Sequence, residues 1–140
     1  MNNERIMIVE DEKIIAIDLQ RRLERFGYDV VGMAGEGTEA VAMALELTPD
    51  IILMDIMLAG DMDGVEAAKA VKASKDIPII FLTAYTDERT LERAKEVEPY
   101  GYILKPFKER ELYTTIDIAL YKHEMASKLT RQERLFSAIL

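Results

Sequence analysis

Four short apolar runs in this chain each end in polar residues of a different chemical type. These residues are Glu10 and Asp11 after the first run, Asp55 after the second, Thr83 after the third and Lys105 after the fourth. If the runs form parallel strands, their carboxyl ends meet at one edge of a sheet, where such proteins bind ligands. Carboxylates are ligands of Mg²⁺, and an ammonium and a hydroxyl suit phosphoryl oxygens. The pattern therefore predicts a pocket for a divalent metal and a phosphoryl group.

The same residues also indicate a reaction. Phosphoryl transfer needs alignment and charge neutralisation more than covalent assistance, and a carboxylate nucleophile can form an acyl phosphate. Three carboxylates held together repel one another. A bound Mg²⁺ and the ammonium of Lys105 would offset that repulsion. The hydroxyl of Thr83 can donate a hydrogen bond to a new phosphoryl oxygen, and the resulting movement would shift the helix that follows.

The composition points to one folded domain. The chain has 140 residues, 49% of them apolar, which is enough for a single core and excludes a disordered chain. No apolar stretch approaches the roughly 20 residues that span a bilayer, and the first strand begins too early for a signal peptide. The absence of cysteines excludes disulfides, and we expect a cytoplasmic protein with no membrane partner. The net charge of −8 argues against direct nucleic-acid binding.

Short apolar strands alternate with amphipathic helices along the chain. The strands are expected at Arg5–Val9, Asp29–Ala34, Ile51–Met54, Ile79–Leu82 and Gly101–Leu104. The helices are expected at Lys13–Phe26, Thr38–Leu47 and Val65–Ser74, with two more that start at Asp87–Glu88 and near Phe107 or Lys108. The predicted apolar face of the first helix consists of Ile14, Ile15, Leu19, Leu23 and Phe26. Five such units indicate an α/β fold, a doubly wound five-stranded parallel sheet flanked by five helices.

Together, these motifs resemble the receiver domain of two-component response regulators. The residue pairs Glu10-Asp11 and Lys105-Pro106, with Asp55 and Thr83 between them, occur in the family's order, and the match covers about residues 4–124. The resemblance implies the flavodoxin-like strand order 2-1-3-4-5 and reversible phosphorylation of Asp55. It implies a signalling switch that is not an enzyme beyond its own phosphorylation and dephosphorylation.

The resemblance also implies a role for each residue of the acidic pocket. Asp55 would be the phosphoacceptor and would take the phosphoryl group from a phosphohistidine on a partner, a sensor histidine kinase or a phosphotransfer protein, or from a small acyl phosphate. Asp11, Asp55 and the backbone carbonyl of Met57 would coordinate Mg²⁺ directly. Glu10 would hold the metal mostly through water.

The switch itself would use four more positions. Thr83 and Lys105 would bind phosphoryl oxygens, and the Lys105-Pro106 peptide bond would be cis. Tyr102 would report the switched state. The alternative for Tyr102 is an ordinary aromatic residue at the edge of the sheet. The two positions that tune phosphoryl lifetime in the family are Met57 and Tyr85 here. Both are bulky and neither is acidic or an amide, so we expect hindered attack by water and a long-lived phosphoryl group.

Other functions fit the sequence less well. A phosphatase with an aspartate nucleophile needs a second acid two residues later, where this chain has Met57. A dinucleotide-binding module needs a glycine loop after the first strand, where Glu10-Asp11-Glu12 would repel phosphate. A pseudo-receiver, a binding module that has lost phosphorylation, is the remaining alternative, and the intact set of site residues argues against it.

The end of the chain admits several interpretations. We expect a receiver domain over residues 1–124 and a helical extension or linker over residues 125–140, which leads towards a further module absent from this chain or folds back on the domain. Apolar residues recur there at helical spacings. A homodimer could form through this extension or through the surface of the fourth helix, fifth strand and fifth helix, with the exposed candidates Arg89, Glu92, Tyr102, Lys108 and Tyr113. We interpret His123 as a solvated helix residue.

Overall fold

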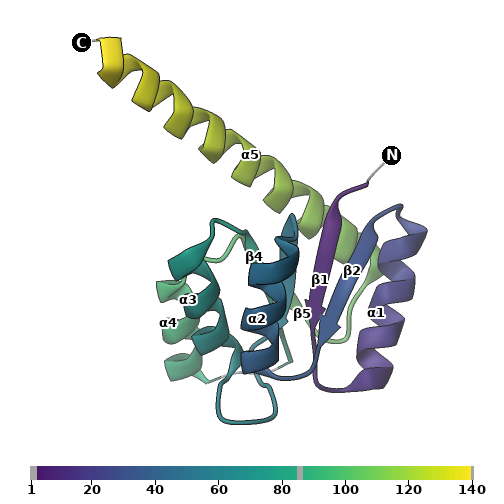
Figure 1. Cartoon of the computed structure of the whole chain (residues 1–140). Coiled ribbons are helices and arrows are strands. Elements are labelled where there is room, and N and C mark those ends of the chain that lie inside the picture. Colours follow the sequence, from purple (N-terminus) through teal and green to yellow (C-terminus); the bar gives the residue numbers. More distant parts are fainter. Residues whose placement is uncertain (1–2, 85–86, 140) are drawn as a thin grey trace.

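Five parallel strands form one sheet with helices on both faces. In the computed structural model, which describes residues 3–84 and 87–139, the strand order is β2-β1-β3-β4-β5 (Figure 1). The strands are β1 (Arg5–Val9), β2 (Asp29–Ala34), β3 (Ile51–Asp55), β4 (Ile79–Thr83) and β5 (Gly101–Leu104). The helices are α1 (Lys13–Arg25), α2 (Gly37–Leu47), α3 (Gly64–Ser74), α4 (Glu88–Glu96) and α5 (Glu109–Ile139). The predicted fold class, strand order and extended last helix are confirmed.

Small differences from the predicted boundaries fall beside the polar residues of interest. Both β3 and β4 run one residue further than predicted, so Asp55 and Thr83 are the last residues of their strands. The backbone ladder continues through these polar side chains because Asp55 still pairs with Leu82 and Thr83 with Leu104. At the start of α4, the Asp87 carboxylate accepts a hydrogen bond of 2.8 Å from the Thr90 backbone N–H, so Asp87 is the N-cap rather than part of the helix.

Alternate residues of each strand enter two separate cores. In β1, Met7 and Val9 pack with α2, α3 and α4, whereas Ile6 and Ile8 pack with α1 and α5. Every residue of β3 and β4 is buried. Coverage of both faces explains why these strands are apolar up to their last residue, as in other parallel sheets. The ends of β3 and β4 therefore have rigid support.

The predicted apolar face of α1 is wrong at one position. Ile14 is 85% exposed, whereas Ala16, Leu19 and Leu23 are buried against the sheet. At about 100° per residue, Ile14 lies on the side of the helix opposite to these three. The helix starts with several consecutive apolar residues, and only the packing against the sheet decides which of them turn inward.

Only the first part of α5 packs on the sheet. Leu112, Ile116 and Ala119 are buried in the same core as α1. The later turns leave the body of the protein, and Figure 1 shows them as the yellow end of a long projecting helix. Within the described residues, no helix has the length and apolar character needed to cross a membrane.

His123 is not simply a solvated helix residue, which corrects our interpretation. Its side chain is half-buried, and the ring stands edge-on to Tyr100 with 5.7 Å between the ring centroids. The Nε2 atom lies 3.2 Å from Oδ2 of Asp76, at the amino-terminal edge of the sheet. The contact arises because α5 lies next to the loop that leads into β4, which sequence periodicity alone does not reveal.

Candidate functional site

The three acidic side chains meet at the carboxyl edge of the sheet. β1 and β3 are neighbours in the sheet, so Glu10 and Asp11, which follow β1, lie beside Asp55 at the end of β3. One carboxylate oxygen from each of the three residues lies within 4.8 Å of the others. Glu10 and Asp55 are buried and Asp11 is exposed. The site therefore has a buried anionic floor and one acid at its rim.

Lys105 bridges the two buried acids. Its Nζ donates hydrogen bonds of 2.7 Å to Oε1 of Glu10 and 2.6 Å to Oδ2 of Asp55. Burial lowers the pKa of the Lys105 ammonium, but the hydrogen bonds to Asp55 and Glu10 outweigh it and raise the pKa above its usual range. The Lys105-Pro106 peptide bond is cis. The residue thus supplies a fixed positive charge to a pocket of fixed negative charges.

Backbone groups orient the carboxylates. The Met57 backbone N–H donates a 3.0 Å hydrogen bond to Oδ1 of Asp55, and that of Glu12 donates a 3.3 Å hydrogen bond to Oε2 of Glu10. Gly64, at the start of α3, lies directly against Asp55, because a Cβ atom there would overlap the Asp55 backbone carbonyl. Sequence reasoning missed this close approach; the only signal for it was the glycine at the start of the predicted third helix.

Loss of hydration and the neighbouring Glu10 carboxyl together raise the pKa of Asp11, and the charge of Lys105 only partly offsets the effect. This mutual repulsion is what a cation at the site would relieve. One or two directly bound carboxylates with room for water and phosphoryl oxygens suit Mg²⁺. The donor set of Glu10, Asp11 and Asp55 therefore fits a hard divalent ion.

A hollow of about 230 Å³ lies over these residues. Its lining includes Asp11, Asp55, Thr83 and Lys105. Thr83 is buried, and its hydroxyl has no hydrogen-bond partner among the described residues. A buried hydroxyl without a partner is uncommon. The lining of the hollow therefore combines a hydroxyl donor without a partner among the described residues, the carboxylate of Asp55 and the ammonium of Lys105.

Tyr102 lies on β5, away from the acids. Its ring packs at 6.2 Å, centroid to centroid, from the buried Phe81, and the residue is 37% exposed. Burial raises the pKa of the Tyr102 hydroxyl, and the charge of Lys95 in α4 partly offsets this. Tyr102 therefore stands between the core and the surface next to α4. The other predicted aromatic, Tyr85, lies outside the described residues.

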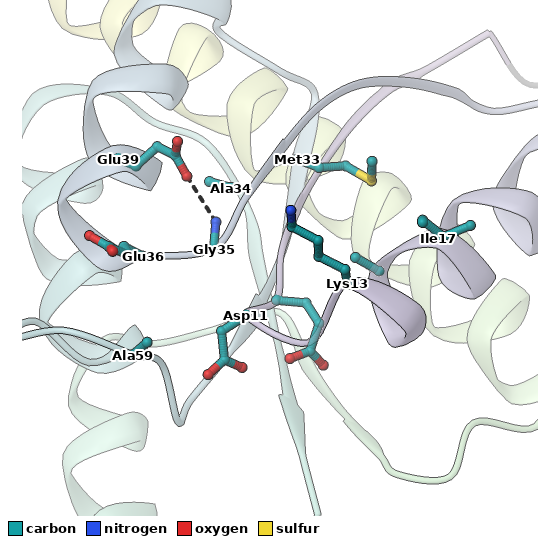
Figure 2. A pocket seen from close by; sticks show the side chains of 11 residues that line it. Asp11, Lys13, Ile17, Met33, Ala34, Gly35, Glu36, Glu39 and Ala59 are labelled. Atoms are coloured by element: carbon teal, nitrogen blue, oxygen red, sulfur yellow. Dashed lines mark hydrogen bonds between the residues drawn. The ribbon is translucent and has the colours of Figure 1, made fainter.

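A second hollow, of about 600 Å³, opens on the other side of Asp11 (Figure 2). Lys13 and Ile17 of α1 form one wall, and Met33 and the turn at Gly35 form the other. The Gly35 backbone N–H donates a 2.9 Å hydrogen bond to Oε1 of Glu39. Sequence reasoning assigned no function to Lys13, Ile17, Met33 or Gly35, and none of these four lines the hollow above Asp55, whereas Asp11 lines both hollows.

A doubly wound sheet with three acids, a hydroxyl and a lysine at its carboxyl edge defines a class of protein that handles phosphoryl groups with a metal. Comparison with known sequences identifies the family within this class. The response regulator receiver domain family matches residues 6–117 of this chain. The chain belongs to this family, as the motifs predicted, and is therefore a two-component signalling domain rather than a conventional enzyme.

Individual relatives agree. The transcriptional regulatory protein PdtaR of Mycobacterium tuberculosis is 35% identical over 136 residues, which cover 94% of this chain. The match spans 66% of the length of that relative, just under two thirds. The solved receiver domain of a modulated diguanylate cyclase from Desulfovibrio desulfuricans G20 is 43% identical, with a TM-score of 0.85 over 89% of this chain and 99% of that one.

One further structure bears on the metal. The receiver domain of a sensor histidine kinase from Pseudomonas aeruginosa PAO1 is 30% identical, with a TM-score of 0.76, and covers 84% of this chain and 98% of that one. That structure has a magnesium ion coordinated in its active-site cleft. Receiver domains bind Mg²⁺ at an acidic site, and Glu10, Asp11 and Asp55 form an acidic cluster in this structure.

Proposed function

We propose that this domain is a phosphorylation-dependent switch in which Asp55 is the phosphoacceptor. The arrangement that supports this most directly is the Asp55 carboxylate, which accepts a hydrogen bond from Lys105 and lines one hollow with the Thr83 hydroxyl, a donor that has no partner among the described residues. A carboxylate oxygen of Asp55 would attack the phosphorus of a phosphohistidine on a partner. The new P–O bond forms as the P–N bond breaks, and the departing imidazole takes up a proton.

Mg²⁺ is the cofactor that fits this site. Asp11 and Asp55 would bind it directly, together with the backbone carbonyl of Met57, and Glu10 would bind it mostly through water. When bound, the ion neutralises the charge that builds up on the phosphoryl oxygens. The Asp11 carboxylate is at the rim, so it is the acid that an arriving ion meets first.

The chain's own residues would transmit the change. Lys105 can exchange its contact with Asp55 for a phosphoryl oxygen, and Thr83 can donate its hydroxyl to another. Thr83 ends β4 only a few residues before the N-cap Asp87, so its movement would shift the start of α4. Tyr102, next to α4, would then change its packing. The switched surface would consist of α4, β5 and α5, with the exposed residues Arg89, Glu92, Tyr102 and Lys108 as its candidates. Tyr113, predicted as exposed, is not one of them, because it is partly buried and its ring packs against Phe26 and Tyr28.

The lifetime of the phosphoryl group depends on access of water to Asp55. The side chain of Met57 is 67% exposed beside the pocket and offers no hydrogen bond to a water. We keep the prediction that Met57 and Tyr85 slow hydrolysis. A half-life shorter than seconds would contradict it.

We also propose the partners and the limits of the domain. The phosphoryl donor would be a sensor histidine kinase or a phosphotransfer protein in the cytoplasm. The receiver would occupy residues 1–124, and residues 125–140 would be an extension towards further chain. Direct contact with nucleic acid is not expected from this chain, because its net charge is −8.

The test is phosphorylation by acetyl phosphate, followed by intact mass measurement. We expect one phosphoryl adduct that requires Mg²⁺ and is absent in the Asp55→Asn variant. A folded protein that binds Mg²⁺ but forms no adduct, either with acetyl phosphate or with a panel of histidine kinases, would instead make it a pseudo-receiver. Absence of Mg²⁺ binding would overturn the assignment of the site.

A further inference from the structure

The exposed side of α5 carries an apolar stripe. Its members are Ile118, Tyr121, Met125, Leu129 and Phe136, with Gln132 as the one polar residue between them. At about 100° per residue, all six fall within a sector of about 80° of the helix surface. Residues in the stripe recur eleven positions apart, as in the pairs 118 and 129 or 125 and 136. Such a repeat keeps one face of a helix in line over its whole length.

This stripe faces away from the rest of the molecule. On α5, the hollow against the body that also contains Asp76 is lined by Leu120, His123, Glu124, Ser127, Lys128 and Arg131. At about 100° per residue, most of these positions lie a third to half a turn from the middle of the stripe, and Lys128 borders it. Tyr121, Leu129 and Phe136 are 63%, 57% and 63% exposed. The apolar side of the projecting helix is thus open along about 27 Å, the length of 18 residues.

Charges beside the stripe are complementary to a second copy of the same helix. In a parallel pair of helices, a residue just before a core position faces the partner's residue five positions further on. Asp117 would meet Lys122 in this way, and Lys128 would meet Glu133. Each pair joins opposite charges and occurs twice in a symmetric dimer. The Lys128 ammonium also lies 3.3 Å from the carboxylate of Glu124 in its own helix. This contact keeps the Lys128 side chain on its own side of the stripe.

We propose that this face of α5 is the interface of a parallel homodimer, in which the stripe of one chain packs in register on the stripe of another. Each apolar residue of the stripe then packs against the same residue of the second chain. Gln132 meets the Gln132 of the second chain and can exchange side-chain amide hydrogen bonds, which favours one register as polar core residues do in coiled coils. The interface does not depend on phosphorylation, so the Asp55→Asn variant should dimerise equally well.

The first test uses sedimentation of the 140-residue chain over a range of concentrations. We expect a monomer–dimer equilibrium that Leu129→Lys weakens at least about tenfold, because two lysines would then face each other in an apolar layer. The neighbouring Thr130→Lys, on the body side of the helix, should leave it unchanged. A chain that stays monomeric to about 0.5 mM, or a dimer that Leu129→Lys does not weaken, would overturn the proposal.

The second test determines the orientation. The chain contains no cysteine, so a single Gln132→Cys reports which residues face each other. A parallel dimer should form a disulfide-linked pair through Gln132→Cys but not through Thr130→Cys. Asp117→Lys and Lys122→Asp should each weaken the dimer, and the double exchange should restore it. Failure of the Gln132→Cys link, or of the restoration, would rule out the parallel register.

Discussion

Lys105 donates hydrogen bonds to Asp55 and to Glu10 at once, at 2.6 and 2.7 Å. The three residues come from the ends of three different strands, and each carboxylate is buried. In this arrangement the lysine occupies the position of a counter-ion for two acids that would otherwise repel each other. Its removal therefore has consequences for stability and for metal binding.

We expect Lys105→Ala to cost about 3 kcal/mol of unfolding free energy in the presence of a chelator, because two buried carboxylates lose their partner. The same variant should bind Mg²⁺ more tightly, since the ion no longer competes with the ammonium, and saturating Mg²⁺ should recover part of the lost stability. Urea unfolding with and without Mg²⁺ measures both effects. Lys108→Ala, at an exposed lysine, is the control. An equal loss in the two variants would contradict this prediction.

Gly64→Ala should disrupt the site. A methyl group at this position would overlap the backbone carbonyl of Asp55, so either the start of α3 or the end of β3 must move. We expect a loss of about 2–3 kcal/mol, in the range for overpacking, together with weaker Mg²⁺ binding. Gly35→Ala is the matched control, because its added methyl would make only ordinary contacts, the nearest at 3.8 Å. Unfolding and Mg²⁺ titrations that do not separate the two variants would refute the role of Gly64.

Thr83→Val should separate stability from switching. The Thr83 hydroxyl is buried and has no hydrogen-bond partner among the described residues, so its replacement by a methyl should leave stability unchanged or raise it by about 1 kcal/mol. The response of α4 and Tyr102 to a beryllofluoride mimic of the phosphoryl group should be lost. Urea unfolding and Tyr102 spectra, with Thr83→Ser as the variant that keeps the hydroxyl, provide the measurement. A full response in Thr83→Val would show that the hydroxyl is not part of the switch.

The pair Asp63–Arg93 should make stability depend on pH in the acidic range. Burial alone would raise the pKa of Asp63, but the 2.9 Å hydrogen bond from Arg93 and the backbone N–H of Glu66 outweigh it and lower the pKa. A carboxyl group whose pKa is lowered by folding stabilises the protein above its unfolded pKa, about 3.9. That stabilisation is lost as the pH falls from there through the folded value.

Asp63 is the N-cap of α3, and its carboxylate accepts the hydrogen bond from the Glu66 backbone N–H. Asp63→Asn keeps the ability to cap the helix but removes the charge. We expect it to be less stable than the original protein at pH 7, with the difference shrinking as the pH falls below about 4. Urea unfolding between pH 7 and pH 3 measures this. A difference that stays constant over that range would mean that the ion pair does not contribute through its charge.

The correction in α1 gives a prediction about the core. Ile14→Ala should change stability by less than about 0.5 kcal/mol, because the side chain is 85% exposed. Leu19→Ala, in the same helix, should cost about 3 kcal/mol, since Leu19 is fully buried. Thermal or urea unfolding compares the two. A large loss in Ile14→Ala would support the face predicted from sequence over the face in the structure.

The amino-acid sequence by itself determined the fold class, the strand order through the family resemblance, and the set of polar residues at the strand ends. Strands buried on both faces must be apolar along their whole length, so β1, β3 and β4 stand out locally. The residues after them then differ visibly from the runs, which is why Glu10, Asp55 and Lys105 could be named before the structure.

Only the tertiary structure decided which contacts these residues make. The bridge from Lys105 to Glu10 joins residues 95 positions apart, and its length depends on how β1 and β5 are placed by the strands between them. The exposure of Ile14, the close approach at Gly64 and the contact of His123 with Asp76 are likewise set by packing between distant elements. Helical and strand periodicity report which residues share a face, but the neighbour that covers that face is chosen by the whole fold.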